Sequence, residues 1–425
     1  MGPLAGVGYH RSNSRPGKDA CSFFGRCFLI GKEMIMNRFI LACLACLLVL
    51  ITPLSAAAYI GLCCGKCGGN MPMNIPNAGI AETYEFRLKL SPEFMKMGGL
   101  TDGTHSVDTD SLLGMPVMNG MPTGKFMAVP TGMDMYMTNL SVGYSFSEKL
   151  FVAMMFMWTK KDMDMKFNSM MKMQTGQNGF TMKSEGMGDI MLMAKYELYA
   201  NDPLIPTAEA SLYLGVSLPT GSIDKRNSDF PLAMRKGELL PYGMQLGSGT
   251  FDPIFGALYE GSSSPYWWGI DAFYTARLYN NSKDYRLGDE FRADLWGMYQ
   301  LSYNLLAQLQ LNGKSTGKIR GMMDESATGA SGRVTQGDPT SPFTTPLWDP
   351  NNYGGNKLSV TAGFQWQPFP MHIIDLQAGV PLYQDLNGPQ LKEKYRVMLT
   401  WYIELPTPAS VRYTGGGKEK SKLGF

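Results

Sequence analysis

The sequence predicts an all-β protein, a single closed antiparallel transmembrane β-barrel of about 12 strands with long external loops. Three observations lead to this fold class. Apolar and polar residues alternate repeatedly, the alternating stretches are long enough to cross a bilayer, and short and long connections follow each other along the chain. Beyond an apolar run near the beginning of the chain, no sustained helical period competes with this pattern.

Alternation with a period of two places successive side chains on opposite faces of a strand. In residues 83–90, aromatic and leucine side chains share one face, and Glu85, Arg87 and Lys89 share the other. The same reasoning predicts strands at 82–90, 134–146, 149–158, 187–199, 207–217, 250–260, 266–279, 284–298, 301–312, 357–367, 372–382 and 393–405.

The predicted strands are about 10 to 14 residues long, against a usual five or six, and this is the length that a tilted strand needs to cross a bilayer. Aromatic residues such as Trp267, Trp296 and Trp401 lie near strand ends, as in the two girdles of outer-membrane barrels. A soluble β-sandwich also alternates, but without strands of this length. Because every backbone N–H must be paired in lipid, the sheet has to close into a barrel.

The connections predict the orientation. Those at 147–148, 201–206, 261–265 and 368–371 are short, whereas those at 91–133, 159–186, 218–249 and 313–356 are long. Outer-membrane barrels have short periplasmic turns and long external loops. We therefore expect both termini in the periplasm of a Gram-negative bacterium, and we expect loop 313–356 to fold inward as a constriction.

The charged faces of the predicted strands carry both signs, which is typical of a polar pore whose residues pair across strands. The predicted pore-lining residues are Glu85, Arg87, Lys89, Lys195, Glu197, Glu209, Asp271, Arg277, Glu290, Arg292, Asp294, Arg396 and Glu404.

The composition excludes several function classes. Only 17% of the 425 residues are charged and the net charge is +2, so no basic surface indicates a nucleic-acid partner. Downstream of the apolar run the histidines are His105 and His372, and neither follows a motif for nucleophilic catalysis. We therefore expect a protein that is not an enzyme, and no catalytic residue is predicted.

The beginning of the chain is typical of an export signal. Phe39 to Ile51 form an apolar run that follows Arg38 and precedes a small-residue stretch ending at Ala58. We interpret 1–58 as a presequence, a misannotated start plus a signal peptide; a membrane anchor is the alternative. Residues 59–81 would then be a Cys- and Met-containing periplasmic segment, 82–405 the barrel and 406–425 a flexible tail.

Methionine is the compositional outlier, with 33 residues, and many fall in the first two predicted external loops. In an extended segment residues i and i+2 face the same way, so pairs such as Met163 and Met165 present two thioethers together. Thioether and thiolate ligands select Cu(I). Copper is therefore the candidate cofactor, with possible ligands at Cys63, Cys64, Cys67, Met71, Met73, Met133, Met135, Met163, Met165, Met171 and Met173.

Two other interpretations of these residues stay open. Methionine is flexible and polarizable and is common on adaptable apolar surfaces, so the same side chains would suit a mouth that receives apolar solutes. Cys63 or Cys64 could form a disulfide with Cys67 in an oxidising periplasm.

Three glycine-containing segments resemble a known family. They are Gly186–Asp189, Gly215–Ser222 (GVSLPTGS) and Leu246–Gly256 (LGSGTFDPIFG), at the ends of neighbouring predicted strands. Together they are similar to the outer-membrane transporter-like barrels of the "MetA-pathway of phenol degradation" family, over roughly residues 130 to 405.

The resemblance implies a passive outer-membrane channel for small hydrophobic or aromatic solutes. The alternative expectation is a Met- and Cys-rich protein that binds or transports copper or another soft metal. The expected partners are outer-membrane lipid, a small-molecule solute and the barrel-assembly machinery.

Overall fold

The computed structural model describes residues 71–76, 83–202, 206–323, 332–335, 338, 340–410 and 412–413, all within the compact unit 59–425. The predicted presequence and Cys63, Cys64 and Cys67 lie outside the described residues. Among the described helices, none is long and apolar enough to cross a membrane.

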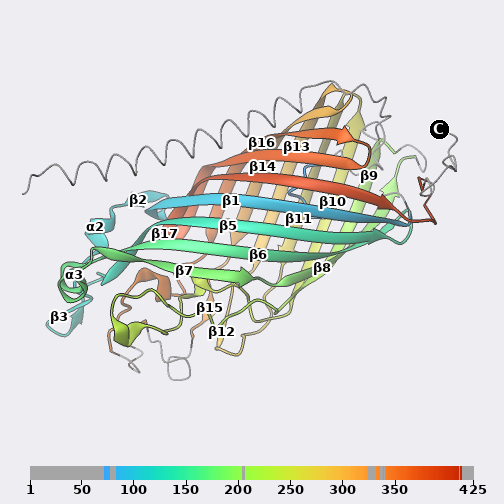
Figure 1. Cartoon of the computed structure of the whole chain (residues 1–425). Helices are drawn as coiled ribbons and strands as arrows, with labels where there is room; N and C mark the ends of the chain where they lie inside the picture. The colour runs from blue at the N-terminus through green and yellow to red at the C-terminus, as the bar shows by residue number, and fades with distance from the viewer. Residues whose placement is uncertain are drawn as a thin grey trace, which may run out of the picture. The chain divides into compact units, whose positions relative to one another are not determined.

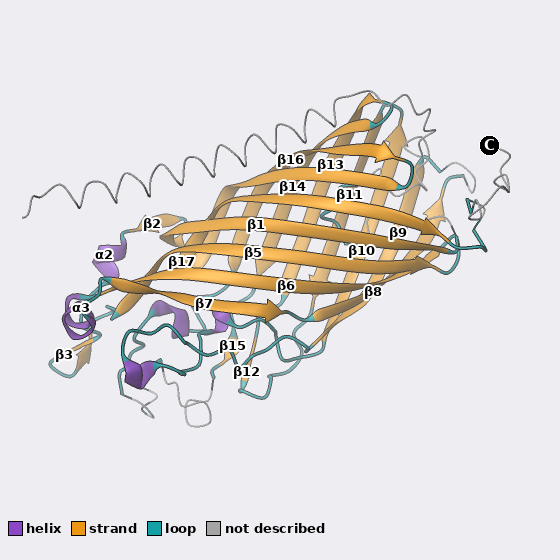
Figure 2. Cartoon of the chain, viewed as in Figure 1, coloured by secondary structure: helices purple, strands orange, loops and turns teal. Residues whose placement is uncertain are grey.

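Eleven strand elements of the described chain form one ring of hydrogen-bonded neighbours, and Figures 1 and 2 show them as the continuous wall of a barrel. All pairs are antiparallel, and β17 pairs with β1 to close the ring. In order around the ring they are β1 (Glu85–Gly103), β5 (Ala128–Ser145), β6 (Leu150–Phe167), β8 (Ile190–Ala200), β9 (Ala208–Leu218), β10 (Asp252–Ser263), β11 (Tyr266–Thr275), β13 (Glu290–Ser302), β14 (Leu305–Thr316), β16 (Gly355–Phe369) and β17 (His372–Pro406).

The last element, β17, supplies two passes of the wall. Residues 372–386 pair with β16, and residues 386–406 pair with β1. The backbone turns back near Gly388, whose φ is +69°, and the side-chain amide of Gln384 donates to the carbonyl of Glu393 across the two arms. A ring of antiparallel neighbours needs an even number of passes. Ten single strands plus the two arms of β17 make the twelve that the sequence predicts.

The wall is taller on one side than the sequence analysis predicted. Residues 91–133 and 159–186 were expected to be external loops, but β1 continues to Gly103, β5 begins at Ala128, β6 continues to Phe167, and β7 (Gly179–Met187) pairs with β6. The physical reason is that methionine alternates with Asp and Lys here, so these segments carry the period of two that defines a strand. We call residues 95–103, 128–137, 158–167 and 179–187 the external extension.

The predicted strand 284–298 also needs correction. It begins only at Glu290, because Tyr285–Arg286 form a separate short strand, β12, that pairs with β15 (Arg320–Gly321) among the loops. The other short elements are β2 (His105–Val107), α2 (Thr109–Leu112), β3 (Val117–Met118), β4 (Met121–Pro122), α3 (Ser169–Thr175), η2 (Ala233–Arg235), η3 (Tyr242–Met244) and η4 (Pro346–Trp348). Figure 2 shows the helices gathered at the end of the barrel that carries the long loops.

Aromatic pairs on the outward face mark both edges of the apolar band. Phe86 packs against Tyr144 at 4.6 Å between ring centroids, and Phe94 packs against Tyr136 at 5.0 Å. Phe86 and Phe94 are separated by about 26 Å along the strand, which is about 20 Å along the membrane normal at a tilt of about 40° and compares with an apolar band of about 25 Å in outer-membrane barrels.

Beyond Phe94 the outward face becomes charged, with Lys96 paired to Asp134 at 2.5 Å and Lys160 paired to Asp162 at 3.6 Å. Charges on a lipid-facing surface are costly, so the external extension lies outside the bilayer. The closed wall and its apolar outward band identify a β-barrel of the bacterial outer membrane.

Candidate functional site

The lumen has a polar wall built from inward-facing side chains of β9 to β17 and the periplasmic half of β1. Asp375 accepts hydrogen bonds from Gln308 and Gln365, each at 2.8 Å, and Asn312 donates to Asp294 at 2.7 Å. These partners are amides and carboxylates on adjacent strands or on strands one apart, so the network ties the strands together from inside.

The predicted pore-lining residues lie on this inward face or beside it. Most are buried; Arg277, Glu290, Arg292 and Arg396 are half-buried, and Arg277 follows the end of β11, where it pairs with Asp252. Their role in a pore stays a prediction. Sequence analysis missed further polar and acidic members of the wall, although their inward position in the alternation was a usable signal. The missed residues are Asp252, Gln308, Gln310, Asn312, Thr361, Gln365, Asp375, Gln377 and Glu393.

The other side of the lumen is rich in methionine side chains. On β1, β5, β6, β7 and β8, methionines recur at inward positions of the alternation, and residues directly opposite each other in the register share a face. We call this set the methionine wall: Met95, Met97, Met133, Met135, Met137, Met155, Met157, Met163, Met165, Met182, Met191 and Met193.

The segment 71–76 occupies the periplasmic part of the lumen, and we call it the plug. Met71, Met73 and Ile75 are at most 1% exposed. Lys89 donates to the carbonyls of Met73 and Ile75, at 3.0 and 3.4 Å. The segment was predicted to lie in the periplasm; instead, lumen side chains hold its backbone inside the barrel.

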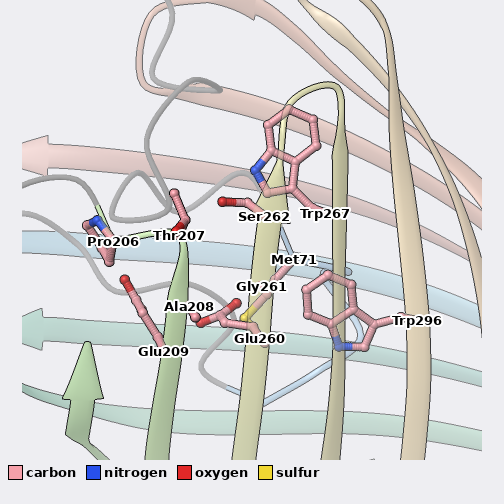
Figure 3. A pocket seen from close by; sticks show the side chains of 10 residues that line it. All are labelled: Met71, Pro206, Thr207, Ala208, Glu209, Glu260, Gly261, Ser262, Trp267 and Trp296. Carbon is pink, nitrogen blue, oxygen red and sulfur yellow. The ribbon is translucent and has the colours of Figure 1, made fainter. Parts of the chain in front are cut away.

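Further contacts fix both ends of the plug. Gln365 donates to the Met71 carbonyl at 2.6 Å, and Asn74 donates to Gln310 at 2.8 Å. A pocket with about 340 Å³ of empty space, part of it open to solvent, lies beside the plug, and Figure 3 shows Met71 there among Glu260, Trp267 and Trp296. The lumen beside the plug is therefore narrow and keeps a small pocket.

The tail predicted at 406–425 is held to the barrel over its described part. Arg412 pairs with Glu85 and, at 2.8 Å, with Glu404, while Ser410 donates to Glu85 at 2.6 Å. These contacts hold residues 410 and 412 at the seam between β1 and β17. Residues 414–425 lie outside the described residues.

Three external loops meet over the opposite mouth. Tyr242, Tyr285 and Trp348 come from loops 219–251, 276–289 and 317–354 and form one buried cluster, with Tyr242 and Tyr285 rings 4.8 Å apart. Burial raises the pKa of Tyr242 and of Tyr285 to about 12. The described part of loop 313–356 thus packs against the two other loops, and its role as a constriction of the lumen stays a prediction.

A hollow with about 480 Å³ of empty space, part of it open to solvent, lies between α3, the external extension and these loops. Its lining is mostly apolar, with a few polar groups that include Asn227 and the ion pair of Arg235 and Glu238. Such a surface fits a small apolar molecule and offers few polar contacts. The apolar lining includes Met127, Met165, Phe167, Met171, Phe180, Met182, Phe230 and Trp348.

The structure separates one predicted thioether pair. Met171 and Met173 lie in the helix α3 and not in an extended segment, so they point in different directions: Met171 is 3% exposed and lines the hollow, whereas Met173 is 82% exposed. Asn168 caps the helix by accepting from the Met171 N–H, and Gly176 ends it with φ +69°.

The other thioether candidates fall into two separate places. Met133, Met163 and Met165 are buried together in the external extension with Met135 against them, whereas Met71 and Met73 lie in the plug. Over the described part of the chain, no group of three or more His, Asp or Glu side chains is placed to hold a metal ion.

One carboxylate joins the three glycine segments. Asp189 accepts from the Gly221 N–H at 2.9 Å and from the Ser248 N–H at 2.7 Å. A Cβ on Gly221 would come within 2.7 Å of the Gly247 Cα, so only glycine permits this approach of the two loop ends. The base of loop 219–251 is therefore fixed to the beginning of β8.

The family model described as "Putative MetA-pathway of phenol degradation" matches residues 135–336. The predicted resemblance is confirmed. The match includes Asp189 and both of the loop segments that it joins. No curated protein is detectably similar in sequence.

Several solved outer-membrane proteins are similar in structure. An outer-membrane channel from Pseudomonas putida F1 has 14% identity and a TM-score of 0.47, covering 76% of this chain and 96% of that one. The P. putida toluene transporter TodX has 10% identity and a TM-score of 0.36, covering 79% and 92%. The transport unit of the Escherichia coli autotransporter AIDA-I has 7% and 0.39, covering 81% and 95%. Structural similarity at these low values of identity and TM-score does not identify the solute that this protein transports.

Proposed function

We propose that the protein is a passive channel of the outer membrane for small apolar solutes, with aromatic molecules as the preferred class. The observation that carries the proposal is the apolar hollow of about 480 Å³ at the external mouth, continuous through Met165 and Met182 with the methionine wall of the lumen. The matched family, named for phenol degradation, supports the same solute class.

The lining of the hollow suits aromatic molecules in particular. Thioether sulfurs attract aromatic rings by roughly 0.3–1.5 kcal/mol per contact. Phe167, Phe180 and Phe230 are mutually packed at its edge, with centroid distances of 4.7 to 5.9 Å, and offer ring faces and edges to a planar guest. No carboxylate or cation other than the Arg235–Glu238 pair lines this part of the described protein.

In the conformation described, both ends of the lumen are restricted. The tyrosine and tryptophan cluster covers the external mouth, and the plug occupies the periplasmic part. Passage therefore requires local movement of the loops or of the plug, and the driving force is the concentration gradient of the solute. Nothing in this scheme uses a catalytic residue.

The test is uptake by intact cells whose outer leaflet is lipopolysaccharide, because apolar solutes cross simple phospholipid bilayers unaided. Cells that express the protein should take up a radiolabelled monoaromatic hydrocarbon faster than cells with empty vector, and a polyol of similar size should show no difference. Equal uptake of the hydrocarbon in both cell lines would refute the proposal.

A further inference from the structure

Four methionines form a row across four neighbouring strands of the external extension. In the strand register, Met97 of β1 lies opposite Met133 of β5, Met133 opposite Met163 of β6, and Met163 opposite Met182 of β7. Strands are about 4.8 Å apart and directly opposed side chains share a face. The four thioethers, which we call the methionine row, therefore point to the same side of the sheet at regular spacing.

The row is enclosed and not spread over a surface. Met133, Met163 and Met182 are 5–6% exposed and belong to one buried cluster, and Met97 packs against it. Met244 of loop 219–251 is fully buried and belongs to the same cluster. Five methionines from five segments thus lie in or against one buried cluster.

The neighbourhood of the row offers soft donors and few hard ones. The buried members of the cluster are all Met, Leu or Val, so no oxygen ligand of the kind that Ca²⁺ or Mg²⁺ requires belongs to it. The nearest inward cation along β6, Lys161, directs its ammonium group to the carbonyls of Gly243 and Gln245, at 2.9 and 2.8 Å. Its charge is therefore satisfied by the loop.

We propose that the methionine row binds a soft monovalent cation of the Cu(I) class, through the thioether sulfurs of Met133, Met163 and Met182, with Met97 or Met244 as a further ligand. Neutral thioethers select such ions among the metals that proteins meet. Methionine has enough side-chain freedom to bring sulfurs on adjacent strands onto one ion. The hollow shares Met182 with the row and gives the ion a path from the external side.

Solute packing alone would explain apolar side chains at these positions but would not require sulfur. Leucine has nearly the volume and apolarity of methionine but no donor atom, so Met→Leu separates the two roles. The row variant is Met133→Leu with Met163→Leu. The matched control is Met118→Leu with Met121→Leu, which removes another cross-strand methionine pair, one that is 61% and 70% exposed on the hairpin β3–β4.

The probe is Ag(I), which is soft, monovalent and stable in air. Detergent-solubilised protein is titrated calorimetrically in chloride-free buffer that contains excess free methionine. The free methionine outcompetes single thioethers of the protein for Ag(I), so only a site with several sulfur ligands retains the ion. Because Cys63, Cys64 and Cys67 would also bind Ag(I), every protein in this titration carries serine at these three positions. The otherwise wild-type protein and the exposed-pair control should then show one binding event. The row variant should lose it or bind at least about tenfold more weakly, the factor that corresponds to a ligand contribution of 1.4 kcal/mol.

Two results would overturn the proposal: absence of competitor-resistant Ag(I) binding to the wild-type protein, or unchanged binding to the row variant. Heat-dependent migration in gel electrophoresis verifies that each variant is a folded barrel. Uptake of the monoaromatic hydrocarbon is measured separately, in cells that express the wild-type protein, and its result does not depend on the metal titration. Failure of metal binding and failure of the proposed channel function are thus distinguishable.

Discussion

The carboxylate of Asp189 accepts a hydrogen bond of 2.7 Å from the backbone N–H of Ser248, 59 residues further along the chain. The other carboxylate oxygen of Asp189 accepts from Gly221, so one side chain holds both ends of the external loop 219–251. That loop contributes Tyr242 to the external cluster and Met244 to the cluster of the methionine row. Asp189 therefore positions both surfaces on which the proposed functions depend.

Asp189→Ala should loosen this loop without opening the barrel. Hydrogen bonds to a charged acceptor contribute about 1.5–3 kcal/mol each, and the substitution leaves two N–H groups without a partner. We expect limited proteolysis of 219–251 to accelerate about 100-fold, the factor that follows from about 3 kcal/mol of lost local stability. Strand content by circular dichroism should be unchanged.

The control for this prediction is Asp224→Ala in the same loop. Asp224 pairs with Lys283 at 2.6 Å, but its side chain is 62% exposed, and exposed ion pairs contribute only about 0–1 kcal/mol. Equal proteolysis rates for the two variants would show that Asp189 does not fix the loop.

Lys89→Met should release the plug. The ammonium group of Lys89 donates to the carbonyls of Met73 and Ile75, and each buried carbonyl that loses its donor costs about 1–3 kcal/mol. We expect the ionic conductance of single channels in planar bilayers, or the fraction of time in the open state, to rise about tenfold or more.

Lys96→Met is the matched control, because Lys96 lies on the same strand but faces outward and pairs with Asp134. Its conductance should equal that of the wild-type protein. If Lys89→Met also conducts like the wild type, the plug is held by other contacts or does not restrict the lumen.

Alkaline pH should open the external cluster. The folded state raises the pKa of Tyr242 and Tyr285 to about 12, mainly through burial, against about 10 in an unfolded chain. A raised pKa of an acid means that the folded state favours the neutral form. The stability that this contributes is complete below pH 10 and is lost as the pH rises through 12.

The measurement is the absorbance of tyrosinate as a function of pH, taken as the difference between the wild-type protein and a variant with Tyr242→Phe and Tyr285→Phe. The difference should titrate near pH 12. A difference that titrates near pH 10 would mean that these rings are hydrated and that the loops do not pack over the mouth.

The period of two was sufficient to predict the barrel, its twelve passes and the inward face, because alternation encodes both the strand and the side that each residue occupies. The same rule also predicts the external extension. When methionine is counted as apolar, it alternates with the polar residues Asp134, Asp162 and Asp164 as in a strand. The loop assignment was wrong because methionine was taken as a potential ligand rather than as part of the strand pattern.

Other parts of the site have no local signal. The plug is held in part by Gln310 and Gln365, whose contacts with it span 236 and 294 residues of sequence. The alternation of Met71, Met73 and Ile75 by itself does not distinguish a segment inside the lumen from a strand. The meeting of Gly221, Ser248 and Asp189 also depends on tertiary distance. By contrast, the separation of Met171 from Met173 was predictable. Asn168 is a typical residue at the beginning of a helix and Gly176 is a typical residue after its end, so a short helix between them was to be expected.

The most direct test of the central claim, that small aromatic solutes pass through the hollow, compares two variants of α3 in the cellular uptake assay. Met171→Lys places a charge in the apolar hollow, where an unpaired ammonium group is unfavourable, and should reduce the initial rate of monoaromatic uptake about tenfold. Met173→Lys makes the same change two residues away on an exposed side chain and should leave the rate unchanged. Equal rates for both variants and the wild-type protein, at equal amounts of folded barrel, would contradict the claim.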